Sequence, residues 1–374
     1  MTLLTRLSET ENSESAEAKK LAVLSFECDE GLANQAEDLK KTISLSGKEY
    51  QVANGFNLYI DISSACNASC PFCIAPTIGR KDGSRFFEGV KFALNLTESI
   101  DGTVQVVGGE PLISKRLIPL LYEFGKRNYR RVVINTNGSC LSDKIVSAMK
   151  ENGVTHVNVS RHHYDEGNNQ EVMRLKPELS NKVFATGLER VAYSGIKTRT
   201  QCNLIKGHID SLQEVINYTD WCSNDIGCKN ISFSQVFPLS LFDYQIPIEP
   251  GYAEKVQIDL GQLVSEIDNC GMFSQIPTNH LDEEGPSPWG TSRWNRPGIG
   301  GKRRFWFGPN GTYISLKTLS GYDESGLPKE AIYNKQDDPE LQDGILEFAV
   351  LHSDGLVTAS WDRRERLLFS PYMR

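Results

Sequence analysis

The sequence predicts an α/β protein built as a partial (β/α)6 TIM-like barrel, with a short N-terminal lead-in and a C-terminal β-containing extension. From residue 55 onward, apolar β-rich segments alternate with segments of helical periodicity. This alternation is typical of a parallel sheet with helices outside it. No G-x-G-x-x-G sequence follows the first strand, which disfavours a dinucleotide-binding fold. We therefore expect a lead-in over 1–54 with a mobile first part, a barrel over 55–271, and a covering or substrate-binding extension over 272–374.

Six strand–helix units follow one another in the barrel segment. The expected strands are 57–62, 103–107, 131–135, 156–160, 198–203 and 230–236. The expected helices are 85–97, 114–128, 141–152, 180–194, 211–223 and 253–270. In the extension, β-like runs stand at 304–307, 313–316, 346–351 and 356–361, and a Ser-Asp-Gly turn joins the last two. Because loops at the carboxyl ends of parallel barrel strands build the active site, functional side chains are expected there.

Composition excludes several classes of protein. The chain has 374 residues and a formal net charge of −8, which disfavours a general nucleic-acid or membrane-surface binder. No stretch approaches the roughly 20 apolar residues needed to span a bilayer. The N-terminal segment is polar and lacks the apolar core of a signal peptide. We therefore expect a cytoplasmic protein without a nucleic-acid or membrane partner.

Cysteine spacing is the most informative feature of the chain. Nine cysteines, an odd number spread unevenly, do not indicate a disulfide framework. Three of them, Cys66, Cys70 and Cys73, form a C-x3-C-x2-C triplet directly after the first barrel strand. Thiolates select zinc or iron–sulfur, but a structural zinc site needs four ligands and no second pair lies nearby. Three thiolates can hold three irons of a cubane and leave the fourth open. A zinc-binding loop remains the alternative.

The triplet and a second motif resemble the radical SAM superfamily. Phe72 supplies the aromatic residue before the last cysteine, and Gly108, Gly109, Glu110 and Pro111 follow the second strand directly. The resemblance is distant to the molybdenum-cofactor cyclase branch. It implies one oxygen-sensitive [4Fe–4S] cluster on the three cysteines, S-adenosylmethionine (SAM) on the open iron, Phe72 near the adenine, and the GGE motif at the methionine amino group. An ordinary strand-to-helix turn is the alternative for the glycines and the acid.

The ends of the later strands supply the remaining candidates. The resemblance implies further SAM-binding residues at Asn137, Ser160, Arg161, Asn203 and Val236. Candidate catalytic residues are Tyr164 and Cys202, and candidate substrate-binding residues are His162, His163, Arg293, Arg296 and Arg303. Guanidinium groups beside glycines suit phosphate or carboxylate. Turn chemistry, a buried small hydrophobe at Cys202 and a solvated basic loop are the alternatives.

The resemblance also implies a reaction. SAM would be cleaved reductively to a 5′-deoxyadenosyl radical, which abstracts hydrogen from a small-molecule substrate, with anionic substrates included. An electron donor such as flavodoxin or ferredoxin would supply the electron. No cysteine follows Cys270, so the second cluster of the cyclase branch is not expected and its reaction is not transferred. Modification of a peptide or protein, and metal binding without catalysis, are the alternatives.

Overall fold

The computed structural model describes residues 41–45, 48–73, 82–236, 248–276, 303–317, 345–361 and 367–372. All of them belong to one compact unit, residues 41–374. The first part of the predicted lead-in, and with it the stretch expected to be mobile, lies outside the described residues. So do Arg293 and Arg296, as well as the side chain of Arg303.

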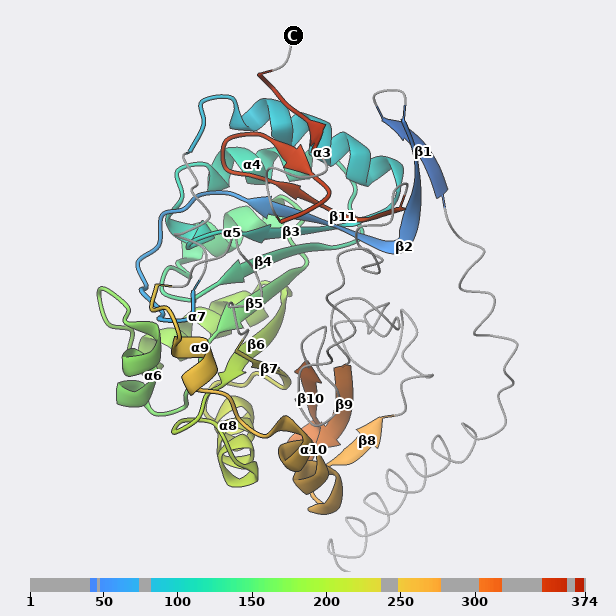
Figure 1. Ribbon diagram of the computed structural model, residues 1–374. Coiled ribbons are helices and arrows are strands. Elements are labelled where there is room, and N and C mark those ends of the chain that lie inside the picture. Colours follow the sequence, from blue (N-terminus) through green and yellow to red (C-terminus); the bar gives the residue numbers. More distant parts are fainter. Residues whose placement is uncertain are drawn as a thin grey trace, which may run out of the picture. The chain divides into compact units, whose positions relative to one another are not determined.

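Six parallel strands form the centre of the sheet, in the order of the sequence (Figure 1). They are β2 (Lys48–Asp61), β3 (Thr103–Val107), β4 (Val132–Thr136), β5 (His156–Ser160), β6 (Lys197–Leu204) and β7 (Asn230–Gln235). The predicted parallel α/β sheet is confirmed. β2 begins earlier than expected because its first half pairs antiparallel with β1 (Lys41–Leu45).

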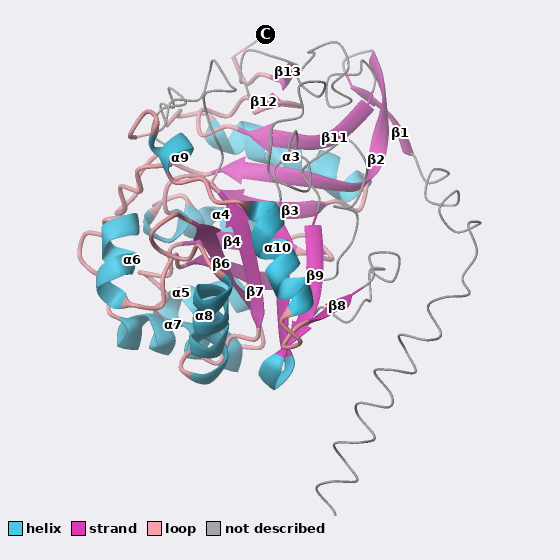
Figure 2. Cartoon of the chain, turned by 60° about the horizontal axis from the view of Figure 1, so that its bottom comes forward, coloured by secondary structure: helices cyan, strands magenta, loops and turns pink. Residues whose placement is uncertain are grey.

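The helices that follow these strands cover one face of the sheet (Figures 1 and 2). They are α3 (Phe86–Ser99), α4 (Leu117–Gly125), α5 (Asp143–Glu151), α7 (Asn181–Tyr193) and α8 (Leu212–Asn224). Strand residues that point to this face, such as Leu58, Ile60 and Val104, are fully buried in the main apolar core. Burial of apolar strand and helix faces against each other accounts for the layered arrangement.

Two helical segments differ from the prediction. The sequence did not indicate α6 (Glu166–Met173), because this helix is almost entirely polar and lacks apolar periodicity. Its start depends on a cap: the side chain of Asp165 accepts a hydrogen bond from the Asn168 N–H at 2.9 Å. The single helix expected over 253–270 is two helices, α9 (Tyr252–Lys255) and α10 (Leu260–Asn269), and Asp259 caps the second.

The extension continues the sheet at both edges. β10 (Thr312–Lys317) pairs parallel with β7, and β11 (Ile345–Leu351) pairs parallel with β2. The remaining elements are η1 (Pro111–Ile113), β8 (Ser274–Ile276), β9 (Arg303–Gly308), η4 (Pro309–Gly311), β12 (Val357–Thr358) and β13 (Leu367–Phe369). β9 pairs antiparallel with β10, and β11 pairs antiparallel with β12, as expected for the two runs that the Ser-Asp-Gly turn joins. Among the described strands β13 and β8 end the sheet, which agrees with a partial rather than a closed barrel.

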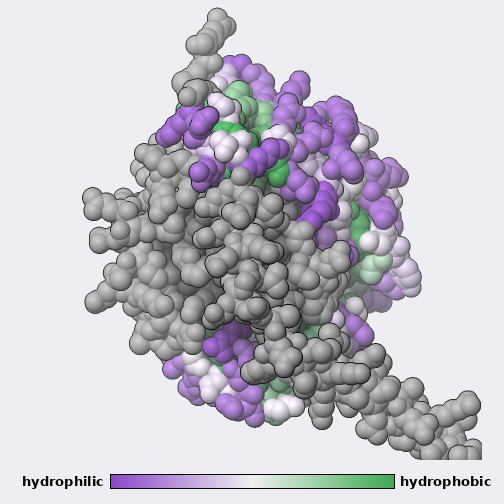
Figure 3. Space-filling view, turned by 90° about the vertical axis from the view of Figure 1, so that its right-hand side faces the viewer, coloured by the Kyte–Doolittle hydropathy of each residue, from purple (hydrophilic) through white to green (hydrophobic). Residues whose placement is uncertain are grey.

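The described surface in Figure 3 is mainly hydrophilic, with small apolar patches. None of the helices in the described ranges combines the length and apolar character that a bilayer crossing requires.

Candidate functional site

The three cysteines lie on the loop that follows β2, residues 62–73, which we call the cluster loop. Cys66 is exposed, Cys70 and Cys73 are half-buried, and none forms a disulfide or other covalent bond. Two backbone hydrogen bonds from the loop after β3 hold the start of the cluster loop. The Gly109 N–H donates to the Ser63 carbonyl at 2.7 Å, and the Glu110 N–H donates to the Ala65 carbonyl at 2.8 Å. The motif after β3 therefore positions the chain immediately before Cys66.

The glycines of this motif are required by the cluster loop itself. A Cβ on Gly109 would lie 2.1 Å from the Ala65 carbonyl oxygen, and one on Gly108 would lie 2.7 Å from that of Ser63. Gly108 also has a φ of +130°, a conformation that residues with a side chain rarely adopt. The close approach of the cluster loop therefore requires glycine at both positions.

Asn67 holds the middle of the cluster loop to the loop after β4. Its Oδ1 accepts a hydrogen bond from Asn137 Nδ2 at 2.8 Å, and its Nδ2 donates to Ser139 Oγ at 3.0 Å. The Asn67 carbonyl accepts from the Lys176 N–H at 2.8 Å. Asn137, predicted to bind SAM, therefore contacts the cluster loop directly.

Two segments later in the chain, at the end of α6 and before α9, hold the last part of the cluster loop. The Ser69 N–H donates to the Met173 carbonyl at 3.1 Å, and the Pro71 carbonyl accepts from the Glu249 N–H at 2.9 Å. An ion pair between Arg174 and Glu249 joins the same two segments. Four separate parts of the chain thus fix the backbone that carries the three thiols.

The chemistry of the three thiols fits a positively charged metal group. Burial raises the pKa of Cys70 far above its usual value, and the neighbouring charges of Cys73 and Cys66 raise it further. Burial also raises the pKa of Cys66. Thiolates crowded in this way need a cation to be stable, and metal binding supplies one while releasing the protons.

A [4Fe–4S] cubane and a single metal ion require different spacings between the three sulfur atoms of this loop. Among the residues that the structure describes, no group of three or more His, Cys, Asp or Glu side chains is arranged to hold a metal ion. A single tetrahedral zinc would need all its sulfurs about 2.3 Å from one point. A cubane offers each cysteine a different iron, so its ligands are spaced more widely.

Glu110 is buried and joins two strand ends. Its carboxylate accepts hydrogen bonds from Thr136 Oγ1 at 2.6 Å, the Asn137 N–H at 2.7 Å and the Leu112 N–H at 3.0 Å. Its side chain is 1% exposed, and burial raises its pKa against the effect of these donors. The carboxylate therefore positions the loop after β4, and its predicted contact with the SAM amino group stays a prediction.

An apolar cluster stands beside the cluster loop. Phe72 packs in it with Val236, Ile205 and Val256. The ring of His162 meets the ring of Phe72 edge-on at 5.3 Å, and His162 Nδ1 accepts from the Asn203 N–H at 3.0 Å. Phe72 and Val236, both predicted to bind SAM, are thus brought together.

Two of the candidate site residues, Arg161 and Cys202, lie on the helix-covered face of the sheet. The Arg161 guanidinium is fully buried under α7, donates to the Leu179 carbonyl at 3.2 Å and stacks on Phe184 at 5.0 Å. Cys202 is 1% exposed and faces the helices, where Tyr218 belongs to the same core. Both side chains point to the helix-covered face, so neither lines an open site.

The opposite, inner face of the sheet carries a row of polar side chains, which we call the inner row: Asn57, Gln105, Asn135, Asn158 and Arg199. Gln105 Nε2 donates to Asn57 Oδ1 at 2.9 Å. Asn158 Nδ2 donates to Asn135 Oδ1 at 2.7 Å, and Arg199 Nε donates to Asn158 Oδ1 at 3.0 Å. All except Asn158 are half-buried. Barrel interiors are usually filled by branched apolar residues, so this row distinguishes the inner face. Ser160, one alternation beyond Asn158, is half-buried on the same face.

The model of the radical SAM superfamily matches residues 60–222, which include the cluster loop and the motif after β3. Residues 60–222 therefore form a domain of the radical SAM superfamily. Enzymes of this superfamily use a [4Fe–4S] cluster and SAM, and the thiols and apolar cluster described above suit those two groups.

Several known proteins are similar to the radical SAM domain. A probable GTP 3′,8-cyclase of Sulfurisphaera tokodaii is 24% identical over 201 residues, 52% of this chain and 61% of the relative. GTP 3′,8-cyclase of Clostridium perfringens is 25% identical over 194 residues, 49% of this chain and 55% of the relative. The chain therefore spans less than two thirds of the length of these relatives. Streptococcus suis SuiB bound to S-adenosylmethionine superposes with a TM-score of 0.49 at 17% identity, over 82% of this chain and 60% of SuiB.

Sequence reasoning missed Asn67 and the inner row. Asn67 lies inside the cysteine triplet, but nothing in its surroundings indicates which distant residues it contacts. The inner row had a detectable signal: an Asn or Gln at an inward position of β2, β3, β4 and β5, with an apolar residue on at least one side.

Proposed function

We propose that this protein is a radical SAM enzyme that cleaves SAM reductively and uses the 5′-deoxyadenosyl radical to abstract hydrogen from a small polar substrate. The single observation that carries the proposal is the cluster loop, whose three thiols are fixed by backbone contacts inside a radical SAM domain. When bound by Cys66, Cys70 and Cys73, a [4Fe–4S] cluster supplies the electron and an open iron for the amino-acid end of SAM.

The described residues around the loop support this chemistry. Phe72, half-buried and packed on the buried side chains of Ile205 and Val236, offers an apolar ring next to the last cysteine. Such a surface suits an adenine ring, and exclusion of water protects a carbon radical from side reactions. Ser160 and Asn203 would reach the sugar or carboxylate of SAM from the neighbouring strand ends.

The inner row supports a polar substrate. Its amides and the guanidinium of Arg199 make the inner face of the sheet polar, which suits a substrate with hydrogen-bonding groups better than an apolar one. Guanidinium binds carboxylate or phosphate through paired hydrogen bonds, so we propose an anionic group on the substrate. The name GTP 3′,8-cyclase describes relatives that act on an anionic nucleotide. Because the chain spans less than two thirds of the length of these relatives, the proposal extends to the class of their substrate and not to their product.

Anaerobic reconstitution tests the cofactor. The chain is incubated with iron and sulfide, its metal content is measured, and SAM is added with dithionite. We expect about four irons per chain and 5′-deoxyadenosine as a product. Cys66→Ala, Cys70→Ala and Cys73→Ala should each abolish both, whereas Cys270→Ala should change neither. One tight zinc per chain without 5′-deoxyadenosine would contradict the proposal and support a metal-binding module.

Deuterium transfer tests the substrate class. Candidate substrates deuterated at the reacting carbon should transfer deuterium to 5′-deoxyadenosine only if they bind at the inner face of the sheet, next to the inner row. Arg199→Gln keeps an amide beside Asn158 but removes the charge, so the KM for an anionic substrate should rise at least about tenfold, the loss of one charge-assisted contact. Lys197→Gln, an exposed charge change on the same strand, is the control. Equal KM values in the two variants would exclude Arg199 from substrate binding.

A further inference from the structure

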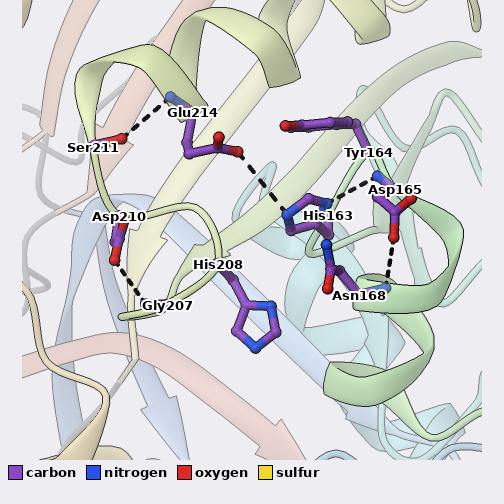
Figure 4. A pocket seen from close by; sticks show the side chains of 9 residues that line it. All are labelled: His163, Tyr164, Asp165, Asn168, Gly207, His208, Asp210, Ser211 and Glu214. Atoms are coloured by element: carbon purple, nitrogen blue, oxygen red, sulfur yellow. Dashed lines mark hydrogen bonds and ion pairs between the residues drawn. The ribbon is translucent and has the colours of Figure 1, made fainter.

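A pocket outside the site described above lies between the loop after β5 and the loop after β6 (Figure 4). Its volume is about 590 Å³, within the range of about 300–1,000 Å³ typical of small-ligand sites. The pocket is lined by three carboxylates, two imidazoles and a phenol: Asp165, Asp210, Glu214, His163, His208 and Tyr164. None of its lining residues is Lys or Arg. His162, the residue before His163, contacts Phe72 instead, so the two consecutive histidines serve different surfaces.

His163 and Glu214 face each other across part of this pocket, as Figure 4 shows. His163 Nε2 lies 4.0 Å from Glu214 Oε2, which is too far for a hydrogen bond. Oε2 of Glu214 and Nδ1 of His208 are buried and make no hydrogen bond. His163 itself is 4% exposed. Buried polar atoms without partners are rare in proteins and indicate a missing water or ligand.

A backbone hydrogen bond determines whether Nε2 of His163 is a donor or an acceptor. Its Nδ1 accepts a hydrogen bond from the Asp165 N–H at 2.9 Å. Burial lowers the pKa of His163, so the ring is neutral at pH 7 and carries one proton. Because Nδ1 is an acceptor, that proton is on Nε2. The gap therefore has a donor on the histidine side and a carboxylate acceptor on the other.

A hydroxyl group is the chemical group that completes this pair. An oxygen about 2.8 Å from both atoms accepts from Nε2–H and donates to the carboxylate. An ammonium group has no acceptor for Nε2–H, and the negative charge of a phosphate is repelled by the three carboxylates of the pocket. Asp165 and Asp210 each use one carboxylate oxygen to accept a backbone N–H, from Asn168 and Gly207 respectively, which holds them in place at the rim.

We propose that this pocket binds a neutral polyhydroxylated ligand, a sugar or a related polyol, with one hydroxyl bridging His163 and Glu214. Further hydroxyls reach the rim carboxylates and His208. The exposed side of Tyr164, whose ring lies 4.5 Å from that of His163, offers a face for the C–H groups of a sugar ring. None of the residues that line the pocket is used in the proposed function, so the inference does not rest on the proposed reaction.

Calorimetric titration with D-ribose tests the proposal, using the full chain saturated with SAM so that ribose does not compete for the SAM site. We expect saturable ribose binding, with ribose 5-phosphate at least about tenfold weaker because of charge repulsion at close range. Ethanolamine is the cationic probe and should bind no more tightly than ribose. Tighter binding of ethanolamine or of ribose 5-phosphate than of ribose would overturn the assignment of a neutral polyol. Absence of ribose binding would overturn it too, and a water molecule would then bridge His163 and Glu214.

Two variants test whether ribose binds between His163 and Glu214. Glu214→Ala removes the acceptor from a partly exposed helix position and should weaken ribose at least about tenfold, the loss of one charge-assisted hydrogen bond. Glu189→Ala, an exposed carboxylate on α7, is the matched control and should leave ribose binding unchanged. A nitrogen NMR spectrum of His163 should show a proton on Nε2 and a shift of that signal on addition of ribose. Equal ribose affinity in both variants, or a proton on Nδ1, would refute the bridge.

Discussion

Replacing Glu110 by alanine separates two roles for the acid of the GGE motif, that of a SAM ligand and that of a positioning residue. The carboxylate satisfies two buried backbone donors, the N–H groups of Leu112 and Asn137, and the hydroxyl of Thr136. An orphaned buried donor costs about 1–3 kcal/mol, so the two backbone N–H groups alone predict that Glu110→Ala lowers the free energy of unfolding by about 2–6 kcal/mol. We expect the lower end, because burial raises the pKa of Glu110 and the variant also removes a desolvated carboxyl group.

Thermal unfolding measures this effect directly. At about 2–4 °C per kcal/mol for a large domain, a loss of about 2 kcal/mol lowers Tm by about 4–8 °C. Glu110→Gln keeps one acceptor and should fall between the wild type and Glu110→Ala. Glu151→Ala, an exposed acid at the end of α5, should change the free energy of unfolding by less than about 0.5 kcal/mol. SAM affinity is then measured on the same samples by equilibrium dialysis. An unchanged Tm together with weakened SAM binding would refute the positioning role and make Glu110 a ligand.

Four further predictions concern individual side chains. Asn67→Ala removes two hydrogen bonds worth about 1 kcal/mol each and should speed the loss of iron to a chelator severalfold, followed by the decay of cluster absorbance. Arg161→Met should alter thermal stability but leave SAM affinity within about twofold, because the guanidinium lies under α7; a tenfold loss in dialysis would restore it as a ligand. Cys202→Ala should yield as much 5′-deoxyadenosine as the wild type by chromatography, since its thiol is in the core. His162, whose pKa burial lowers to about 3, should stay neutral in NMR titrations from pH 8 to about pH 5. As pH falls below about 6.5, His162 is protonated in the unfolded chain but stays neutral in the folded one. The folded state therefore loses stability relative to the unfolded state over this pH range.

The parallel sheet and its order were predictable because strands and helices differ in apolar periodicity. β3 and β5 match the expected bounds, since each is a short β-branched run between polar turns. α6 was not predictable in the same way. Only Val172 and Met173 among its apolar residues are buried, and a cap from Asp165 rather than an apolar stripe defines its start.

Side-chain direction at the strand ends was harder to predict than position. Ser160 is the last residue of β5, and the alternation that assigns inner and outer faces ends with the strand. Arg161 then points under α7, His162 towards Phe72 and His163 into the pocket of Figure 4. The sequence predicted functional residues along this stretch, but only tertiary contacts determine the direction in which each side chain points.

The C-terminal extension is joined to the cluster loop through one arginine, so it is not an independent cover. Arg116, at the start of α4, donates from Nη1 to the Ile62 carbonyl at 3.1 Å, where the cluster loop begins, and to the Ser353 carbonyl at 2.7 Å in the turn after β11. Its Nη2 donates to the Gly83 carbonyl at 2.7 Å, and its guanidinium stacks over Phe86 at 4.4 Å. Guanidinium is the side chain that can satisfy three carbonyls at once in a fixed plane. Because β11 also pairs directly with β2, the strand that leads into the cysteines is held by the extension along both its length and its end. The position of the cluster loop therefore depends on residues nearly 300 positions apart in the chain, and no local motif encodes it.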